Sequence, residues 1–396
     1  MDIAKSQYNL IMVGLSVGRI VPLALLVLVR AHRCAYQAPT IYKAILPQIV
    51  SSRVLRRSSQ LQSKSPMFSS LRQSLRLTGF AQKASPLSRQ ASTWQTLGAN
   101  ESQTITLPDD RTLGFATYGP EDGDPVFYFH GLPGSRIDAR RLEGLDESKT
   151  LRFIGIDRPG IGLSTPKEGR TLMDWPSDVT SLAEHLGIDQ FKVIGESGGG
   201  PYALSCARAL SKDRLKATGV LYGGAPLEAG RTGMNWSQAI GWYIAPRSRW
   251  LLRTLSQPYF GKAAQDPDPK AMEDLIRRVF FRGLREDELE LLEKPQSMKD
   301  SVEALKEAFR QGTDGYAHDT QILGHSWDFK LEDIDAKNVF LWYGEDDDLA
   351  PVHMARYLHE RLKGSVLKTW KGETHYTLAD EERQGKTIIR MLAEAE

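Results

Sequence analysis

Residues 191–210 read FKVIGESGGGPYALSCARAL, and this stretch decides how the chain is expected to fold. Three of its first four residues, Phe191, Val193 and Ile194, are apolar and favour an extended backbone, so residues 191–194 predict a buried strand. A glycine-rich turn follows at residues 195–199. The next residues predict a helix with apolar side chains at Tyr202, Leu204, Cys206 and Leu210. A serine at the apex of so sharp a turn projects its hydroxyl away from the backbone, so Ser197 is the candidate nucleophile. The alternative is a turn that merely reverses the chain.

Similar apolar stretches occur on both sides of this one. Two short strands around the turn at residues 108–110 predict a hairpin. Further strands are predicted at residues 125–131, 153–156, 218–222, 339–342 and 366–369, and helices at 138–148, 178–187, 352–362 and 380–393. The regular alternation of strand and helix predicts a doubly wound, mostly parallel, eight-stranded sheet flanked by helices.

Three loops after predicted strands carry chemically competent side chains. Ligands of such sheets bind at the carboxyl ends of the strands. The first loop begins at His130, the second holds four consecutive acids at residues 345–348, and the third contains His375. Together with Ser197, an acid and a histidine in this chain order are what an acyl-transfer triad needs. The acid run could instead be a cation site, but a triad acid fits it better.

The motifs HGLPGS, DRPGIGLS, GESGGGPYA, YGEDDDLAP and GETHY resemble those of the α/β-hydrolase superfamily, in the form with a cap, from about residue 104 to the C-terminus. The resemblance implies an acid in the pattern G-x-x-D-x-x-x-P, which selects Asp347. Asp346 and Asp348 are one residue out of register, and Glu228 is the alternative acid position. The histidine of the closing loop corresponds to His375.

The resemblance also implies a mechanism. His375 would take the proton of Ser197 while Asp347 holds the imidazole, and the backbone amides of Leu132 and Gly198 would bind the oxyanion. The expected activity is hydrolysis of an ester-like bond in a small to medium, apolar substrate, with no metal or organic cofactor required. Alternatives are an acyltransferase, a peptidase or a C–C hydrolase with the same triad, or a binding protein without catalysis. The motif HGLPG in place of HGGPG disfavours a proline iminopeptidase.

Other polar residues have open or structural interpretations. Glu196, beside the nucleophile, either faces the site or points to solvent. Asp157 and Arg158 are expected to fix their own loop. His318 and His325 are candidates for substrate contact. The remaining histidines considered are expected to be structural or solvated: His130, His185, His353 and His359.

The segment of residues 226–337 is too long for a simple connection between two strands, and it predicts a helical cap. Residues 101–225 and 338–396 form the predicted core. The first part of the cap is rich in aromatic and basic residues: Trp236, Trp242, Tyr243, Trp250, Tyr259, Phe260, Arg231, Arg247, Arg249 and Arg253. One interpretation is an apolar tunnel with a cationic rim, suited to a hydrophobic or anionic substrate or to a membrane surface. The preferred interpretation is that the aromatic side chains pack the cap onto the core.

The charge of the chain is unevenly distributed along its 396 residues. Its net charge is +2, yet residues 3–100 contain no Asp or Glu and carry 13 of the 51 Lys and Arg residues. The acidic remainder does not fit a nucleic-acid-binding protein. With only Cys34 and Cys206, a disulfide framework is not expected in the core.

Residues 1–100 form a basic leader. An apolar run begins at Leu10 and ends at Val29, and it predicts a membrane anchor, although Arg19 and Pro22 interrupt it. From Met67 the acid-free, Arg- and Ser-containing composition is typical of a mitochondrial transit peptide. A generic disordered tail is the alternative. Mitochondrial import or membrane anchoring is therefore expected, and the oligomeric state is left open.

Overall fold

The computed structural model describes residues 97–234, 239, 242, 243 and 245–395. These residues fall within one compact unit, Ala91–Glu396. The predicted anchor between Leu10 and Val29 and the predicted import signal at Met67 lie outside the described residues. Among the helices that the structure describes, none combines the length and apolar character needed to cross a bilayer.

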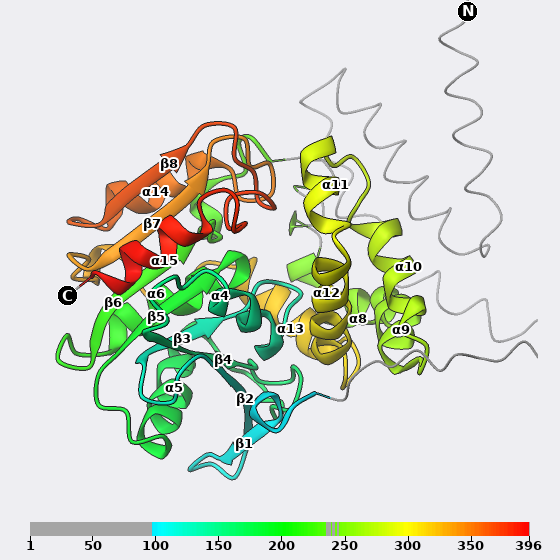
Figure 1. Cartoon of the computed structure of the whole chain (residues 1–396), viewed down its shortest axis with the longest axis horizontal. Helices are drawn as coiled ribbons and strands as arrows, with labels where there is room; N and C mark the ends of the chain where they lie inside the picture. The colour runs from blue at the N-terminus through cyan, green and yellow to red at the C-terminus, as the bar shows by residue number, and fades with distance from the viewer. Residues whose placement is uncertain (1–96, 235–238, 240–241, 244, 396) are drawn as a thin grey trace, which may run out of the picture. The chain divides into compact units, whose positions relative to one another are not determined.

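In the described part of the chain, eight strands form one sheet in the order β1-β2-β4-β3-β5-β6-β7-β8. The strands are β1 Gln103–Thr106, β2 Thr112–Tyr118, β3 Asp124–Phe129, β4 Leu151–Ile156, β5 Phe191–Glu196, β6 Leu215–Leu221, β7 Val339–Gly344 and β8 Val366–Trp370. β2 pairs antiparallel with β1 and β4, and all other pairs are parallel. This arrangement confirms the predicted mostly parallel sheet (Figure 1).

Both faces of the sheet are covered by helices. The core helices are α4 Arg140–Glu143, α5 Trp175–His185, α6 Gly200–Ala209, α14 Val352–Arg361 and α15 Gly385–Ala393. Along β3, Val126 and Tyr128 join the apolar cluster that includes residues of α14 and α15, while Phe127 and Phe129 join the cluster of α5 and α6. Successive side chains of a strand point to opposite faces, so a strand covered on both faces reads as a continuous apolar run.

Three predicted helices have other bounds than expected. The helix expected at residues 138–148 is only α4 Arg140–Glu143, preceded by a 3₁₀ turn at Arg136–Ala139. The helix expected from residue 178 begins at Trp175, because Pro176 is tolerated in the first turn, where its missing N–H is not needed. The helix expected from residue 380 begins at Gly385. Residues 380–384 form turns instead, and the amide of Gly385 donates to the carbonyl of Asp380.

The segment between β6 and β7 is helical, and we call residues 226–337 the cap segment. Its helices are α8 Arg249–Ser256, α9 Lys262–Gln265, α10 Lys270–Val279, α11 Glu286–Leu292, α12 Pro295–Ala308 and α13 Asp314–Leu323, with a one-turn π-helix at Gln257–Gly261 between α8 and α9. Figure 1 shows α8 to α12 gathered to one side of the sheet. Residues of α9, α10 and α12 form a small apolar core of their own, which also takes in Ile161.

Candidate active site

Ser197 lies at a sharp turn between β5 and α6. Its φ is +50°, in the left-handed region that is costly for a residue with a side chain. The neighbouring glycines permit the turn: a Cβ on Gly195 would overlap the carbonyl oxygen of Gly199, and a Cβ on Gly199 would overlap that of Phe129. The backbone is therefore shaped to hold the serine hydroxyl beyond the end of the sheet.

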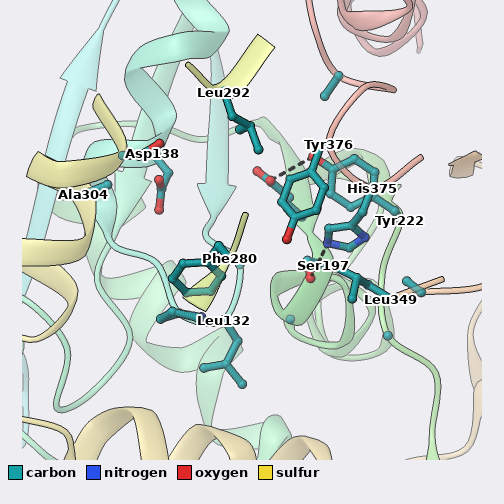
Figure 2. Close-up of a pocket in the computed structure, with 18 of the residues that line it drawn as sticks. Leu132, Asp138, Ser197, Tyr222, Phe280, Leu292, Ala304, Leu349, His375 and Tyr376 are labelled. Carbon is teal, nitrogen blue, oxygen red and sulfur yellow. Dashed lines mark hydrogen bonds between the residues drawn. The ribbon is translucent and has the colours of Figure 1, made fainter. Parts of the chain in front are cut away.

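The structure brings Ser197, His375 and Asp347 together (Figure 2). His375 Nε2 lies 3.1 Å from Ser197 Oγ, and His375 Nδ1 lies 2.8 Å from Asp347 Oδ2. The side chain of Asp347 is fully buried, and its Oδ1 accepts the backbone amides of Leu349 and Ala350, each at 2.8 Å. A carboxylate at Nδ1 places the imidazole proton there, which leaves the Nε2 lone pair facing the serine hydroxyl.

The alternative acids lie elsewhere. Asp346 is exposed, and its carboxylate lies 3.6 Å from Arg285. Asp348 is exposed as well. Glu228 is exposed and accepts a hydrogen bond from the hydroxyl of Ser326. Within the described ranges, no group of three or more His, Cys, Asp or Glu side chains is arranged to hold a metal ion.

The loop that carries Leu132 is held from behind by Arg158. The guanidinium of Arg158 donates to the carbonyl oxygens of His130 at 2.5 Å and Gly131 at 2.9 Å. The C=O and N–H of a trans peptide point in opposite directions, so a Gly131 carbonyl turned toward Arg158 directs the Leu132 amide away from it. On that opposite side lies Gly198, where a Cβ would stand 3.4 Å from Leu132 N. Both predicted oxyanion donors thus line the same small region next to Ser197.

His130 has the structural role that the sequence predicted. Its Nε2 accepts the backbone amide of Arg158 at 3.3 Å, and its Nδ1 contacts the carbonyl of Gly131 at 2.9 Å. Burial, assisted by the nearby charge of Arg158, holds the pKa of His130 well below its ordinary value. The neutral ring therefore braces the loop.

A buried residue of the cap segment supports Arg158. Asp319, on α13, accepts from Arg158 Nε at 2.6 Å, from Tyr202 Oη at 3.0 Å and from Arg170. Burial alone would raise the pKa of Asp319, but the two guanidinium groups outweigh it and hold the pKa below its ordinary value. Sequence reasoning assigned Arg158 to its loop but missed Asp319, whose partner is 161 positions away.

Glu196, whose orientation the sequence left open between the site and solvent, lines the cavity beside Ser197. Tyr222 Oη donates to Glu196 Oε1 at 2.9 Å, and Tyr128 and Arg141 both contact Oε2. Burial raises the pKa of Tyr222, despite the opposing charge of Arg141, so Tyr222 remains a donor. The ring of Tyr222 in turn lies against His375, with centroids 4.3 Å apart. Sequence reasoning did not single out Tyr222.

The cap segment also contacts the loop of His375. Thr374 Oγ1 donates to Glu288 Oε1 on α11 at 2.6 Å. Arg285, one residue before α11, donates to the carbonyl of Gly372 at 3.1 Å. The position of α11 is therefore linked to the backbone of the loop that carries His375.

A cavity of about 860 Å³ lies between these loops and the cap segment. Apolar side chains of the cap segment form much of its lining: Phe260, Ile276, Phe280, Phe281, Leu291 and Leu292. A polar part of the lining consists of Asp138, Arg141 and Glu196. In Figure 2, Asp138 lies across the pocket from Ser197. Burial raises the pKa of Asp138 to about 6, against the opposing effects of the Ser135 amide and Arg141.

The two cap histidines do not belong to this cavity. Among the described residues that line it, neither His318 nor His325 is present. His318 is buried, and His325 contacts the carbonyl of Gln321 at 2.6 Å. The expectation that they contact substrate is therefore not supported by their positions.

Comparison with known proteins identifies the family. A sequence model described as alpha/beta hydrolase fold matches residues 124–381. Because this match covers more than half of the chain, the protein belongs to the α/β-hydrolase fold family.

Individual relatives differ in their names. A proline iminopeptidase of Xanthomonas citri is 34% identical over 107 residues, which cover 26% of this chain and 34% of that protein. A non-heme chloroperoxidase of Burkholderia pyrrocinia is 26% identical over 288 residues, 68% of this chain and 92% of that protein. The structure of an esterase from Exiguobacterium antarcticum superposes with a TM-score of 0.51 at 17% identity, over 74% of this chain and 100% of the esterase. The first curated relatives are matched over only about a third of their length.

Proposed function

We propose that the protein is a serine hydrolase that cleaves an ester-like bond through an acyl-enzyme. The observation that carries this proposal is the continuous chain of contacts from Asp347 through His375 to Ser197, with separations of 2.8 and 3.1 Å. Nucleophilic catalysis needs a hydroxyl beside a general base that a third group orients.

In the proposed first step, Ser197 Oγ attacks the substrate carbonyl carbon and its proton passes to His375 Nε2. The carbonyl oxygen becomes an oxyanion held by the amides of Leu132 and Gly198, each worth roughly 3 kcal/mol in comparable sites. The buried carboxylate of Asp347 stabilises the imidazolium. His375 then returns the proton to the leaving oxygen, and the carbon–oxygen bond breaks. Water deprotonated by the same histidine releases the acyl group and regenerates the serine.

The cavity supports an apolar substrate of small to medium size. Its volume of about 860 Å³ is in the range of drug-sized ligand sites. The aromatic and aliphatic side chains of the cap segment offer surface for the apolar part of the substrate. Arg141 and Glu196 neutralise each other on the polar side, so the substrate need not carry a charge there.

A peptidase with the same triad is the second candidate. It is favoured by relatives named proline iminopeptidase, which match part of the chain at 32 to 34% identity. The motif HGLPG at residues 130–134 is the sequence feature that weighs against it.

One experiment separates these functions. We would measure turnover of p-nitrophenyl esters of increasing chain length and of prolyl p-nitroanilide by the wild type and by Ser197→Ala. Ester turnover that falls about 10⁴-fold or more in the variant supports the proposal. Turnover of the anilide alone would replace it with the peptidase. No turnover of either, together with no fluorophosphonate adduct on Ser197, would overturn the catalytic assignment in favour of a binding protein.

A further inference from the structure

Several large apolar side chains of the cap segment are exposed. The exposed fractions are 70% for Trp250, 57% for Tyr243, 53% for Leu255, 47% for Tyr259 and 37% for Leu251. The preferred sequence interpretation, in which the cap aromatics pack inward, is therefore wrong for these tyrosines and for Trp250. It holds for Trp242, which packs against the apolar cluster of α5 and α6. Phe260 instead stacks on Phe309 within the cap segment itself, with centroids 4.9 Å apart. We call the five exposed residues the cap face.

Three of the five cap-face residues lie on α8. Leu251 and Leu255 are four residues apart, so they lie on the same side of the helix, with Trp250 next to them. Tyr259 continues the run in the following helical turn. Ser256, on the other side of α8, is buried and donates to the carbonyl of Leu252. An exposed patch of large apolar side chains is a common mark of an interaction site.

Around the cap face three arginines, at positions 247, 249 and 253, outnumber two acids, Glu168 and Asp314, which leaves a small positive excess. Residues 229–265 contain no Asp or Glu. Arg249 is paired with Glu168 and Asp314 from other elements. Arg253 shares Asp314 with Arg249, and its 59% exposed side chain lies 4.0 Å from that carboxylate. Arg247 is also exposed and lies 3.8 Å from the ring centre of Tyr243.

The cap face continues into the cavity. Trp242 and Phe260 line the cavity, whereas their chain neighbours Tyr243 and Tyr259 are exposed. Val279 lines the cavity and is also 46% exposed. Apolar surface therefore extends from the outside of the cap segment to the chamber that holds Ser197.

We propose that the cap face docks on the surface of an anionic lipid bilayer. Tryptophan and tyrosine favour the boundary between headgroups and acyl chains, and shallow insertion of leucine side chains adds apolar burial. Exposed arginines are attracted by the negative potential of anionic lipids, with about 1 kcal/mol per basic residue near the surface. A second copy of the chain fits less well, because a symmetric contact would bring Arg247 and Arg253 of both copies together. Docking would let an apolar substrate pass from the bilayer into the cavity.

The first test places an environment-sensitive fluorophore on the cap face of the full chain. Cys34→Ser removes one native thiol, and the other, Cys206, is buried. Leu255→Cys labelled with NBD should shift to the blue and brighten severalfold on addition of vesicles of phosphatidylcholine and phosphatidylserine, with a smaller response to phosphatidylcholine alone. Val366→Cys, which replaces a 42% exposed valine on β8, is the matched control and should not respond.

The second test is sedimentation of the full chain with the same vesicles. Leu251→Glu combined with Leu255→Glu should weaken binding by about tenfold or more, because two apolar side chains are replaced by anions. Val366→Glu should bind like the wild type. Thermal unfolding of each variant checks that the fold is kept.

Three results would overturn the proposal. The first is a label at position 255 that does not respond to vesicles, even if the full chain sediments with them through another part. The second is a label that is already blue-shifted without vesicles at every protein concentration, which would mean that the chain covers its own cap face. The third is a blue shift that appears with rising protein concentration alone, which would mean that a second copy covers it.

Discussion

The ring of Tyr222 lies against the imidazole of His375, with centroids 4.3 Å apart and an angle of 47° between the planes. Tyr222 follows the last residue of β6 and adopts a positive φ of 36°. Its hydroxyl is anchored by Glu196, the residue before Ser197. The strand end that carries the candidate nucleophile and the loop that carries the candidate base are thus connected through one tyrosine. We infer that Tyr222 positions His375.

Substitution of Tyr222 tests this positioning role. Tyr222→Phe keeps the ring but removes the hydrogen bond to Glu196, so we expect a loss of stability of about 1–2 kcal/mol and little change in kcat. Tyr222→Ala removes the surface behind His375, and we expect kcat to fall up to about 10²-fold with a small change in KM. Steady-state kinetics and urea unfolding of both variants measure these effects. Equal kcat values for the two variants would refute the positioning role.

Asp347 can be compared with its own neighbour. Asp347→Asn should lower kcat by about 10⁴-fold, because an amide at this position no longer favours the imidazole tautomer that accepts the serine proton. Asp346→Asn changes the adjacent, exposed carboxylate and should leave kcat within about twofold. Ester turnover by the two variants is the measurement. If Asp346→Asn were the more damaging, the triad acid would be misassigned.

Asp319 should stabilise the folded protein at neutral pH, and this contribution should be lost in acid. Its pKa in the folded protein is below the ordinary value of about 3.9, so its contribution is present above that pH and is lost as the pH falls below it. Asp319→Asn leaves Arg158 and Arg170 buried with less counter-charge and should cost about 3–5 kcal/mol at pH 7. Urea unfolding from pH 7 down to about pH 3 should show the difference from the wild type shrinking.

A control for Asp319 is available on the same helix. Asp314, also on α13, is a partly exposed partner of Arg249. Asp314→Asn should therefore lower the free energy of unfolding by less than about 1 kcal/mol. Folded Asp319→Asn should also have a lower kcat, because Arg158 holds the loop of Leu132. A pH-independent difference between Asp319→Asn and the wild type would contradict the electrostatic interpretation.

Asp138 should have the opposite pH dependence. Its pKa is raised by burial to about 6, above the unfolded value of about 3.9. The folded state therefore holds this proton more tightly, and stability is lost as the pH rises through about 6. Asp138→Asn keeps an acceptor for the Ser135 amide but cannot ionise. Relative to the wild type, it should gain stability between pH 4 and about pH 7, by no more than about 3 kcal/mol. Urea unfolding at both pH values decides this, and a constant difference would show that Asp138 does not titrate in this range.

Much of this site could be predicted because its signals are local. The turn around Ser197 is encoded by adjacent residues, since only small side chains fit between the strand and the helix. The acid loop and the loop of His375 each follow an apolar strand, and parallel strands bring their carboxyl ends to one edge. Local patterns of this kind are sufficient to predict the sheet and the three loops that carry the triad candidates, whereas the choice of Asp347 among the four acids came from the resemblance to the α/β-hydrolase superfamily.

The supporting residues could not be predicted in this way. Asp319 and Arg158 meet across 161 positions, and neither carries a local sign of its partner. Tyr222 lies in the stretch LYGGAP, where its left-handed backbone and its contact with His375 depend on the packed strand ends. Trp250 was misjudged because an aromatic residue in a helix is usually buried, and only the folded cap segment shows which side of α8 is covered.

The placement of Asp319 on α13 has a consequence for protein engineering. A minimal version of this protein, trimmed to its sheet and core helices, would lose the counter-charge of two arginines that stay inside the trimmed domain. The deletion would therefore damage the domain that it was meant to isolate, and a chimera with a foreign lid must supply a carboxylate at the same point.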